Sequence, residues 1–327
     1  MSRDKLRDVA AVAMRWNYRV WGFGEAIALR GLLHAGDLLG DPAPFGFVHG
    51  LMRSWLGRGV ARTNEDHVGA GRELLELYQR TNDSQFLDAA RKLAALNASF
   101  SAGPNGARYH RGDTPGWRHQ IWVDCMDIDG PFLAALAHAT SEDRYFEQAV
   151  SELLGYARTL QSDSGLLFHG FERDCGKNGE LWARGNGWAL MGLVDTLTLL
   201  PRSHPAWNEL QQRTVALADA LADTQAASGL WHTVLNDPAT YLESTLATMA
   251  AYALREAITH GVLDARYEEM EHKARAAMHT QIAADGTLQL VSDATPVGAR
   301  AVYATRPFGT FPWGQGPLLL ALCQEVE

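Results

Sequence analysis

The sequence has few cysteines and no long apolar run, and both absences narrow the class of protein. Its 327 residues include only three cysteines, Cys125, Cys175 and Cys323, too few and too scattered for a disulfide framework or a zinc cluster. No apolar run approaches the roughly 20 residues needed to span a bilayer, and the N-terminal residues lack the apolar core of a signal peptide. We therefore expect a soluble, cytoplasmic protein without a membrane partner.

The chain also has fewer basic residues than acidic ones. The chain carries 29 lysines and arginines against 38 aspartates and glutamates, a formal net charge of −9. Because binding to a phosphate backbone needs a basic face, we expect no nucleic-acid partner, although one or two local arginines suffice for a small anionic ligand. The chain has no His-Glu-x-x-His, Gly-x-Ser-x-Gly or paired-cysteine motif. Its twelve histidines are dispersed, so neither a metal nor another cofactor is indicated.

Alternating β-branched runs are scarce, and helical periodicity predominates along the chain. The pattern predicts twelve helices and an all-α protein. The expected helices span residues 4–17, 24–39, 47–57, 67–80, 84–100, 125–140, 143–160, 187–200, 206–226, 243–260, 265–283 and 315–326. No linker or low-complexity segment divides the chain, so we expect one catalytic domain over residues 1–327.

The loops between these helices contain a repeat. Gly165 and Gly229 occupy equivalent places in two similar segments, and fainter copies contain Gly106 and Gly286. Each segment ends a long helix, turns at a glycine able to adopt a positive φ, and continues as a short apolar stretch. A spacing of roughly 60 residues suits a two-helix unit. Six such units would close into an (α/α)6 barrel with a ligand site at one end; an open solenoid is the alternative.

The stretch from Gln120 to Ala134 is the strongest candidate for chemistry. It contains Trp122 and three carboxylates, Asp124, Asp127 and Asp129. Helical spacing puts Asp124 and Asp127 on one face and Asp129 elsewhere. A carboxylic acid beside another carboxylate and walled by an aromatic ring retains a proton near neutral pH, so it can donate and accept protons in catalysis. The alternative is a solvated, acidic helix start in which the carboxylates cap the helix.

Two further candidates lie elsewhere in the chain. Asp66 opens a predicted helix, where the alternative role is again an N-cap. His169 ends the clearest repeat loop; the echo of this residue at His232 favours a structural role as strongly as a functional one.

Residues 181–192 place Trp182, Arg184 and Trp188 around what we interpret as a Gly-x-Gly turn leading into a helix. Flat rings suit sugars, and an arginine suits a carboxylate. A nucleotide loop is disfavoured because no clear strand precedes the segment and no P-loop lysine follows it. The alternative is a purely structural turn. The aromatic, glycine-rich residues 303–319 could line the mouth of the same site.

These residues resemble the unsaturated glucuronyl and rhamnogalacturonyl hydrolases, glycoside hydrolase families 88 and 105, and more closely the second. The resemblance extends over most of the chain. It rests on Ile121–Asp124, on Gly165–Gly170 and, most specifically, on the run Trp182-Ala-Arg-Gly-Asn-Gly-Trp188, with weaker support from residues 229–245 and Trp313–Gly316. The resemblance implies the (α/α)6 barrel that the helix count also predicts.

The resemblance also implies an activity and a set of site residues. These enzymes release 4,5-unsaturated uronic acid from the non-reducing end of oligosaccharides made by polysaccharide lyases, by hydrating the C4=C5 vinyl ether. Asp124 would protonate C4 and, as a carboxylate, activate the water that adds at C5; the resulting hemiketal then opens and releases the aglycone. This scheme differs from the two-carboxylate glycosidase mechanisms. Asp66 would be the second catalytic acid, and the implied substrate-binding residues are Trp122, His169, Trp182, Arg184 and Trp188.

The sequence departs from the family pattern at two positions, where Asp127 replaces an aromatic or apolar residue and Asp129 a small one. The extra charge disfavours a second uronate nearby, and the chain is short for the family, so the aglycone is left open. Two other functions also remain open: another (α/α)6 sugar enzyme, either an inverting glycosidase or a sugar 2-epimerase, and a non-catalytic binding or scaffold protein. Either a monomer or a homodimer is compatible with the sequence.

Overall fold

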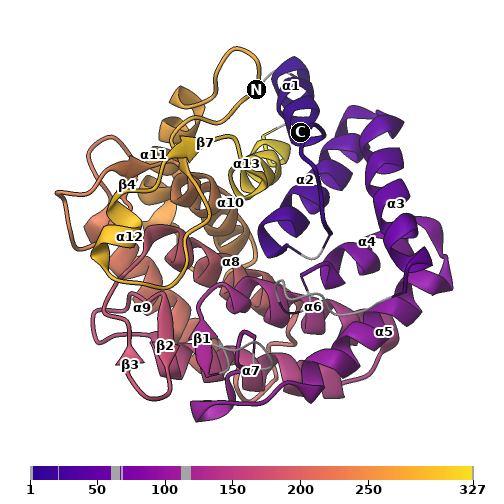
Figure 1. Ribbon diagram of the computed structural model, residues 1–327, viewed down its shortest axis with the longest axis horizontal. Coiled ribbons are helices and arrows are strands. Elements are labelled where there is room, and N and C mark those ends of the chain that lie inside the picture. The colour runs from indigo at the N-terminus through magenta and orange to yellow at the C-terminus, as the bar shows by residue number, and fades with distance from the viewer. Residues whose placement is uncertain (1–2, 21, 60–66, 68, 112–118, 326–327) are drawn as a thin grey trace.

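Six helices stand side by side around a central axis and form a closed inner ring (Figure 1). The computed structural model describes residues 3–20, 22–59, 67, 69–111 and 119–325. Each inner helix contacts the next one in the chain, and the last contacts the first. The inner helices are α2 (Phe23–Leu39), α4 (Gly71–Thr81), α6 (Cys125–Thr140), α8 (Ala183–Leu199), α10 (Thr245–Thr259) and α13 (Pro312–Cys323). The contact between α13 and α2 excludes the open solenoid.

Six outer helices alternate with the inner ones along the chain and cover the ring. They are α1 (Arg3–Ala13), α3 (Pro42–Gly57), α5 (Ser84–Ser99), α7 (Arg144–Leu160), α9 (Trp207–Thr224) and α11 (Glu268–Thr280). Outer helices such as α9 bury one apolar face, whereas α8 is buried along almost its whole length, the difference expected between covering and central helices. The predicted (α/α)6 barrel is confirmed. No helix in the described residues is long and apolar enough to cross a membrane.

The four repeat glycines adopt the positive φ that the sequence predicts. Their φ angles are 92° at Gly106, 94° at Gly165, 83° at Gly229 and 90° at Gly286. The turn also brings each of the last three glycines against the next outer helix: a Cβ at Gly165, for example, would lie 2.2 Å from the carbonyl oxygen of Ala216 in α9. A side chain is therefore excluded by conformation and by packing together.

Short strands lie among the loops that follow the outer helices. Strands β1 (Gln120–Trp122), β2 (Gly170–Glu172) and β3 (Gly176–Lys177) form an antiparallel sheet. The pairs β4 (Trp231–His232) with β5 (Leu242–Glu243) and β6 (Val291–Ser292) with β7 (Phe308–Gly309) are also antiparallel. The remaining short elements are η1 (Pro104–Gly106), η2 (Ala265–Tyr267) and α12 (Arg300–Ala304). Trp122 pairs with Gly170, and this register brings Asp124 and His169 together.

Three helices begin at least three residues earlier than predicted. Helix α3 starts at Pro42 rather than residue 47, because the Asp41 side chain accepts a hydrogen bond from Ala43 N and proline is well suited to the first helical position. Helix α13 starts at Pro312 rather than residue 315. The short helix α12 was not predicted.

The third early start corrects the interpretation of the Gly-x-Gly segment. Helix α8 begins at Ala183 rather than residue 187, so Gly185 and Gly187 belong to its first turns and do not form a tight turn. Their role is close packing: a Cβ at Gly185 would lie 2.6 Å from Val123 Cγ1, and one at Gly187 would lie 2.3 Å from Met249 Sδ.

Candidate active site

A cavity of about 410 Å³ opens where the N-terminal ends of four inner helices, α2, α6, α8 and α13, converge. Its walls are rich in aromatic rings and carry charges of both signs. The lining residues include Trp16, Arg19, Glu25, Arg111, Trp122, Asp124, Trp182, Arg184, Asp293, Phe311 and Trp313. Because helix N-termini carry partial positive charge, this end of the barrel favours an anionic ligand.

Asp124 contributes the carboxylate most deeply set in this wall. It stands at the N-cap position of α6, yet its side chain makes no capping hydrogen bond. The residue is only 1% exposed and still lines the cavity. The N-capping alternative is therefore wrong for Asp124, whose carboxylate faces the cavity and His169.

His169 lies directly behind Asp124 and is fully buried. Its Nε2 is 3.3 Å from Asp124 Oδ2, and its Nδ1 is 2.7 Å from the hydroxyl of Tyr303. The rings of Trp122 and Trp182 lie 5.2 Å and 4.3 Å from the imidazole, centroid to centroid. Burial lowers the pKa of His169; Asp124 opposes this effect and Arg184 adds to it. The imidazole is therefore neutral at physiological pH.

Arg184 lines the cavity, but its terminal nitrogens already have protein partners. Nη1 donates to Glu243 and to Ser292, and Nη2 donates to Asp293 O and Thr295 Oγ1, all within 3.1 Å. These bonds hold residues 292–295 against the barrel. A ligand carboxylate would have to compete for the same donors, so Arg184 fixes the wall of the cavity as well as contributing positive charge.

Of the two remaining predicted residues, only Trp188 is described by the structure, and it does not reach the cavity. Trp188 is fully buried in the hydrophobic core and is not among the lining residues. Asp66 lies outside the described residues. Of the seven predicted site residues, Trp122, Asp124, Trp182 and Arg184 line the cavity, and His169 supports it from behind.

Asp127 and Asp129 occupy separate surroundings on opposite sides of α6. Asp129 is fully buried, accepts a hydrogen bond from Tyr156 at 2.7 Å and lies 3.0 Å from His67 Nδ1. Asp127 borders a small internal cavity with Arg30 and other charged residues. Burial raises the pKa of Asp127 to about 6. Neither residue lines the large cavity.

A possible metal site requires separate consideration, because nitrogen and sulfur atoms of His67, His110 and Cys125 lie within 4.8 Å of one another. His67 Nδ1 faces the carboxylate of Asp129, however, and its Nε2 faces the carbonyl oxygen of Tyr109 at 3.0 Å. Burial opposes a charged ring, but Cys125 and Asp129 outweigh it and hold the pKa of His67 well above its usual range. A ring that donates from both nitrogens is a poor metal ligand.

Several cavity residues were missed by sequence reasoning. Trp16 follows α1, and its Nε1 donates to Glu25 at the start of α2. Phe311 and Trp313, stacked 4.6 Å apart, complete the wall with Trp16. Arg19 and Glu25 belong to no motif, so local sequence patterns carry no signal for them. Phe311 and Trp313 were not missed, because they fall within residues 303–319, the segment that the sequence offers as a lining of the mouth.

A carboxylate set into an aromatic cavity at one end of an (α/α)6 barrel defines a carbohydrate-active enzyme. The family model described as Glycosyl Hydrolase Family 88 matches residues 5–327, and the chain belongs to this family. The unsaturated rhamnogalacturonyl hydrolase YesR of Bacillus subtilis (strain 168) is 28% identical over 290 residues, 85% of this chain and 82% of the relative.

Solved structures share the fold over the whole chain. A possible GH105 member from Salmonella enterica serovar Paratyphi A has a TM-score of 0.87 at 23% identity, covering 100% of this chain and 94% of the other. The unsaturated glucuronyl hydrolase of Bacillus sp. GL1 has a TM-score of 0.75 at 17% identity, covering 99% and 97%. The predicted family is confirmed, and the protein is a glycoside hydrolase.

Proposed function

We propose that Asp124 is the general acid and base with which this protein releases 4,5-unsaturated uronic acid from the non-reducing end of oligosaccharides. The observation that carries the proposal is the position of Asp124. Its carboxylate makes no helix-capping hydrogen bond and lies in the wall of an aromatic cavity. Trp122, Trp182 and Trp313 provide flat faces for a sugar ring. Arg19, Arg111 and Arg184 supply positive charge around a ligand carboxylate.

The proposed reaction consumes one water molecule. Protonated Asp124 transfers its proton to C4 of the C4=C5 double bond, and the positive charge that develops is shared by C5 and the ring oxygen. Water adds to C5 and gives a proton back to the Asp124 carboxylate, which restores the acid. The hemiketal then opens: the bond from C5 to the ring oxygen breaks, the proton of the new C5 hydroxyl passes to the ring oxygen, and a ketone at C5 and a hemiacetal at C1 remain. As the hemiacetal hydroxyl becomes the C1 aldehyde, its proton passes to the aglycone oxygen, the bond from C1 to that oxygen breaks, and the aglycone leaves as an alcohol. In this proposal the whole chain is one catalytic domain that works as a monomer or a homodimer, and Asp66 is the second catalytic acid.

Substitution of Asp124 tests the proposal directly. Asp124→Asn removes proton transfer while keeping size and shape, so we expect kcat to fall by about 10²–10⁴-fold. The assay follows the absorbance of the C4=C5 bond across a panel of unsaturated disaccharides that differ in aglycone. Asp163→Asn is the matched control. It changes an exposed aspartate in the turn after α7, outside the cavity lining, and should retain full activity. Undiminished turnover by Asp124→Asn would remove Asp124 from the mechanism.

The same panel, extended by the corresponding saturated disaccharides, separates the alternatives. A sugar 2-epimerase would leave glycosidic bonds intact, and an inverting glycosidase would cleave saturated substrates equally well. A non-catalytic binding protein would bind the disaccharides without consuming them. Release of the aglycone together with loss of the double bond supports the proposed hydrolysis and none of the three alternatives.

A further inference from the structure

The amide of Asn178, in the loop after β3, has an orientation fixed by two backbone groups. Its Oδ1 accepts a hydrogen bond from Gly170 N at 3.2 Å, and its Nδ2 donates to Gly298 O at 3.0 Å. A flipped amide would place donor against donor and acceptor against acceptor. The group that faces the hydroxyl of Tyr303 at 2.9 Å is therefore the amide nitrogen, which donates to it.

The hydroxyl of Tyr303, in α12, consequently has a fixed direction. Its oxygen accepts from Asn178 Nδ2 and also from Gly298 N at 3.3 Å. A phenol oxygen has two lone pairs and one hydrogen, and these two donors occupy the lone pairs. The hydrogen points at the third neighbour, His169 Nδ1, at 2.7 Å. Tyr303 is fully buried, so water does not compete for these positions.

The direction of this bond determines the tautomer of His169. Because Nδ1 accepts from Tyr303, the neutral imidazole carries its hydrogen on Nε2, which faces Asp124 Oδ2 at 3.3 Å. The two atoms do not meet hydrogen-bond geometry, and catalytic hydrogen bonds often tighten only in the complex with substrate. The charged and titratable groups around the ring are Asp124, Tyr303 and Arg184; burial and Arg184 both disfavour a second proton.

We propose that Asn178 and Tyr303 are positioning residues that hold His169 as the Nε2–H tautomer, with this hydrogen aimed at Asp124 Oδ2. One oxygen of Asp124 then faces a donor at 3.3 Å, and the other exchanges a proton with substrate and water. In the opposite tautomer, the Nε2 lone pair would face the carboxylate and either repel it or take its proton. The effect of this tautomer on catalysis rests on the proposed function of Asp124, whereas the tautomer itself can be measured without any activity.

Nitrogen-15 NMR of the histidine rings in the full-length protein without substrate tests the tautomer. Two-bond and three-bond proton–nitrogen correlations distinguish Nε2–H from Nδ1–H, and His169→Gln identifies the signals that belong to this ring. We expect the Nε2–H pattern in the unsubstituted protein. Tyr303→Phe removes the hydroxyl that fills Nδ1, so we expect a mixture of tautomers.

Asn178→Asp provides the opposite perturbation at nearly constant volume. A carboxylate beside Tyr303 accepts the hydroxyl hydrogen, so the Tyr303 oxygen becomes an acceptor for His169 Nδ1. We expect the NMR signals of His169 to show a hydrogen on Nδ1. A purely structural role for Asn178 would not reverse the tautomer.

Kinetics links the tautomer to the reaction. Tyr303→Phe should lower kcat by about 10-fold or more, the scale seen when a partner that orients a catalytic histidine is lost, with KM within about twofold and a displaced pH–rate profile. Tyr267→Phe is the matched control, because it removes a hydroxyl hydrogen-bonded to Asp219 near η2, outside the cavity lining. We expect that control to keep the kcat and pH profile of the unsubstituted enzyme.

The proposal is overturned if His169 carries its hydrogen on Nδ1 in the unsubstituted protein, or if Tyr303→Phe changes neither the tautomer nor the pH profile. These outcomes are distinguishable from failure of the proposed function. A protein with the Nε2–H tautomer that leaves every unsaturated disaccharide intact would refute the hydrolase proposal and keep the arrangement of His169. Loss of turnover in Asp124→Asn, with no effect of Tyr303→Phe on kcat or tautomer, would refute the positioning role alone.

Discussion

At the scale of single residues, acids and arginines of four inner helices form a buried charge cluster within the ring. Asp195 binds both Arg30 and Arg72 there, and Asp127 and Glu73 border the same small cavity. Burial raises the pKa of Glu73 to about 8 and that of Asp127 to about 6, although Arg30 opposes both shifts. Both carboxyl groups therefore favour their neutral forms more in the folded chain than in the unfolded chain.

This shift predicts a pH-dependent stability. A carboxyl group with a raised folded pKa binds more protons in the folded state, so its contribution to stability falls as pH rises from the unfolded pKa to the folded one. For Asp127 the window is pH 4 to 6. The side chain of Asp127→Asn is neutral at every pH, so the variant does not lose this stability. We expect its free energy of unfolding, relative to that of the unsubstituted protein, to increase by about 1–2 kcal/mol between pH 4 and pH 7.5.

Urea unfolding at several pH values measures this difference. Glu73→Gln is the parallel variant, and its gain should continue to about pH 8, following the higher pKa of Glu73. A pH-independent difference for Asp127→Asn would show that Arg30 and Arg72 keep this carboxylate ionised in both states.

The sequence predicted some of the site residues and not others for a physical reason. Asp124 and His169 were recognisable because each stands in a local motif, and the β1–β2 register then brings them together. Asp127 was expected beside Asp124 from helical spacing alone. Ser292, Asp293 and Thr295, which accept hydrogen bonds from Arg184, lie more than 100 residues away from it. The hydroxyl of Tyr303 is equally remote from His169, and local patterns carry no information about such contacts.

At the scale of elements, the crossing of α6 and α8 sets the position of Asp124. Gly192 of α8 lies against the backbone of α6, and a Cβ there would be 2.2 Å from the carbonyl oxygen of Met126, two residues after Asp124. Backbone atoms cannot rotate away as a side chain can. The close approach of these helices therefore depends on the absence of a side chain at this position.

Gly192→Ala should push the two helices apart. We expect a loss of about 1–3 kcal/mol in the free energy of unfolding, with a fall in kcat because the start of α6 moves. Gly50→Ala in α3 is the matched control: the glycine is exposed and a Cβ would meet nothing within 4 Å. There alanine should stabilise the helix by about 0.5–1 kcal/mol. Equal effects at both positions, measured by denaturant unfolding, would contradict the packing role of Gly192.

Glycines also explain where the prediction of elements succeeded and failed. The end of α2 was placed correctly because Gly40 adopts a left-handed C-cap, with a φ of 63°. The start of α8 was placed four residues late because Gly185 and Gly187 were taken as a turn. A glycine needed for close packing inside a helix has the same sequence signal as a glycine that ends one, and only the neighbouring helix distinguishes them.

At the scale of the whole molecule, the barrel was predictable because its repeat is visible in the sequence. Four of the two-helix units end in the same glycine turn, and six units suffice to close a ring. Closure itself depends on α13 meeting α2, at the two ends of the chain. Gly316 allows this approach, since a Cβ there would lie 2.6 Å from the backbone nitrogen of Ala28. No local pattern indicated that pairing.

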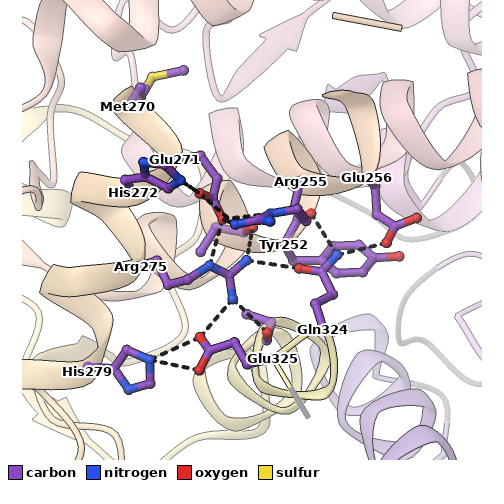
Figure 2. A network of polar contacts seen from close by, with 12 residues as sticks. Tyr252, Arg255, Glu256, Met270, Glu271, His272, Arg275, His279, Gln324 and Glu325 are labelled. Atoms are coloured by element: carbon purple, nitrogen blue, oxygen red, sulfur yellow. Dashed lines mark hydrogen bonds and ion pairs between the residues drawn. The ribbon is translucent and has the colours of Figure 1, made fainter. Parts of the chain in front are cut away.

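Figure 2 shows a second set of contacts that joins the last helices of the ring. Arg275 of α11 donates to Glu271 and to Glu325, and also to the backbone oxygens of Ala251 in α10 and Ala321 in α13. Its side chain is 11% exposed, and that of Glu271 is 1% exposed. One guanidinium thus connects three helices on which closure of the barrel depends.

Replacing Arg275 by methionine should destabilise the closed ring as a whole. The substitution leaves Glu271 buried with weaker partners and frees two helix carbonyls, so we expect a loss of about 3 kcal/mol in the free energy of unfolding. Lys273→Met, from the same helix, removes an exposed pair with Glu269 and should cost no more than about 0.5 kcal/mol. Denaturant unfolding of the two variants measures the difference. Comparable losses would mean that Arg275 acts as an ordinary surface charge and that apolar packing between α13 and α2 closes the barrel unaided.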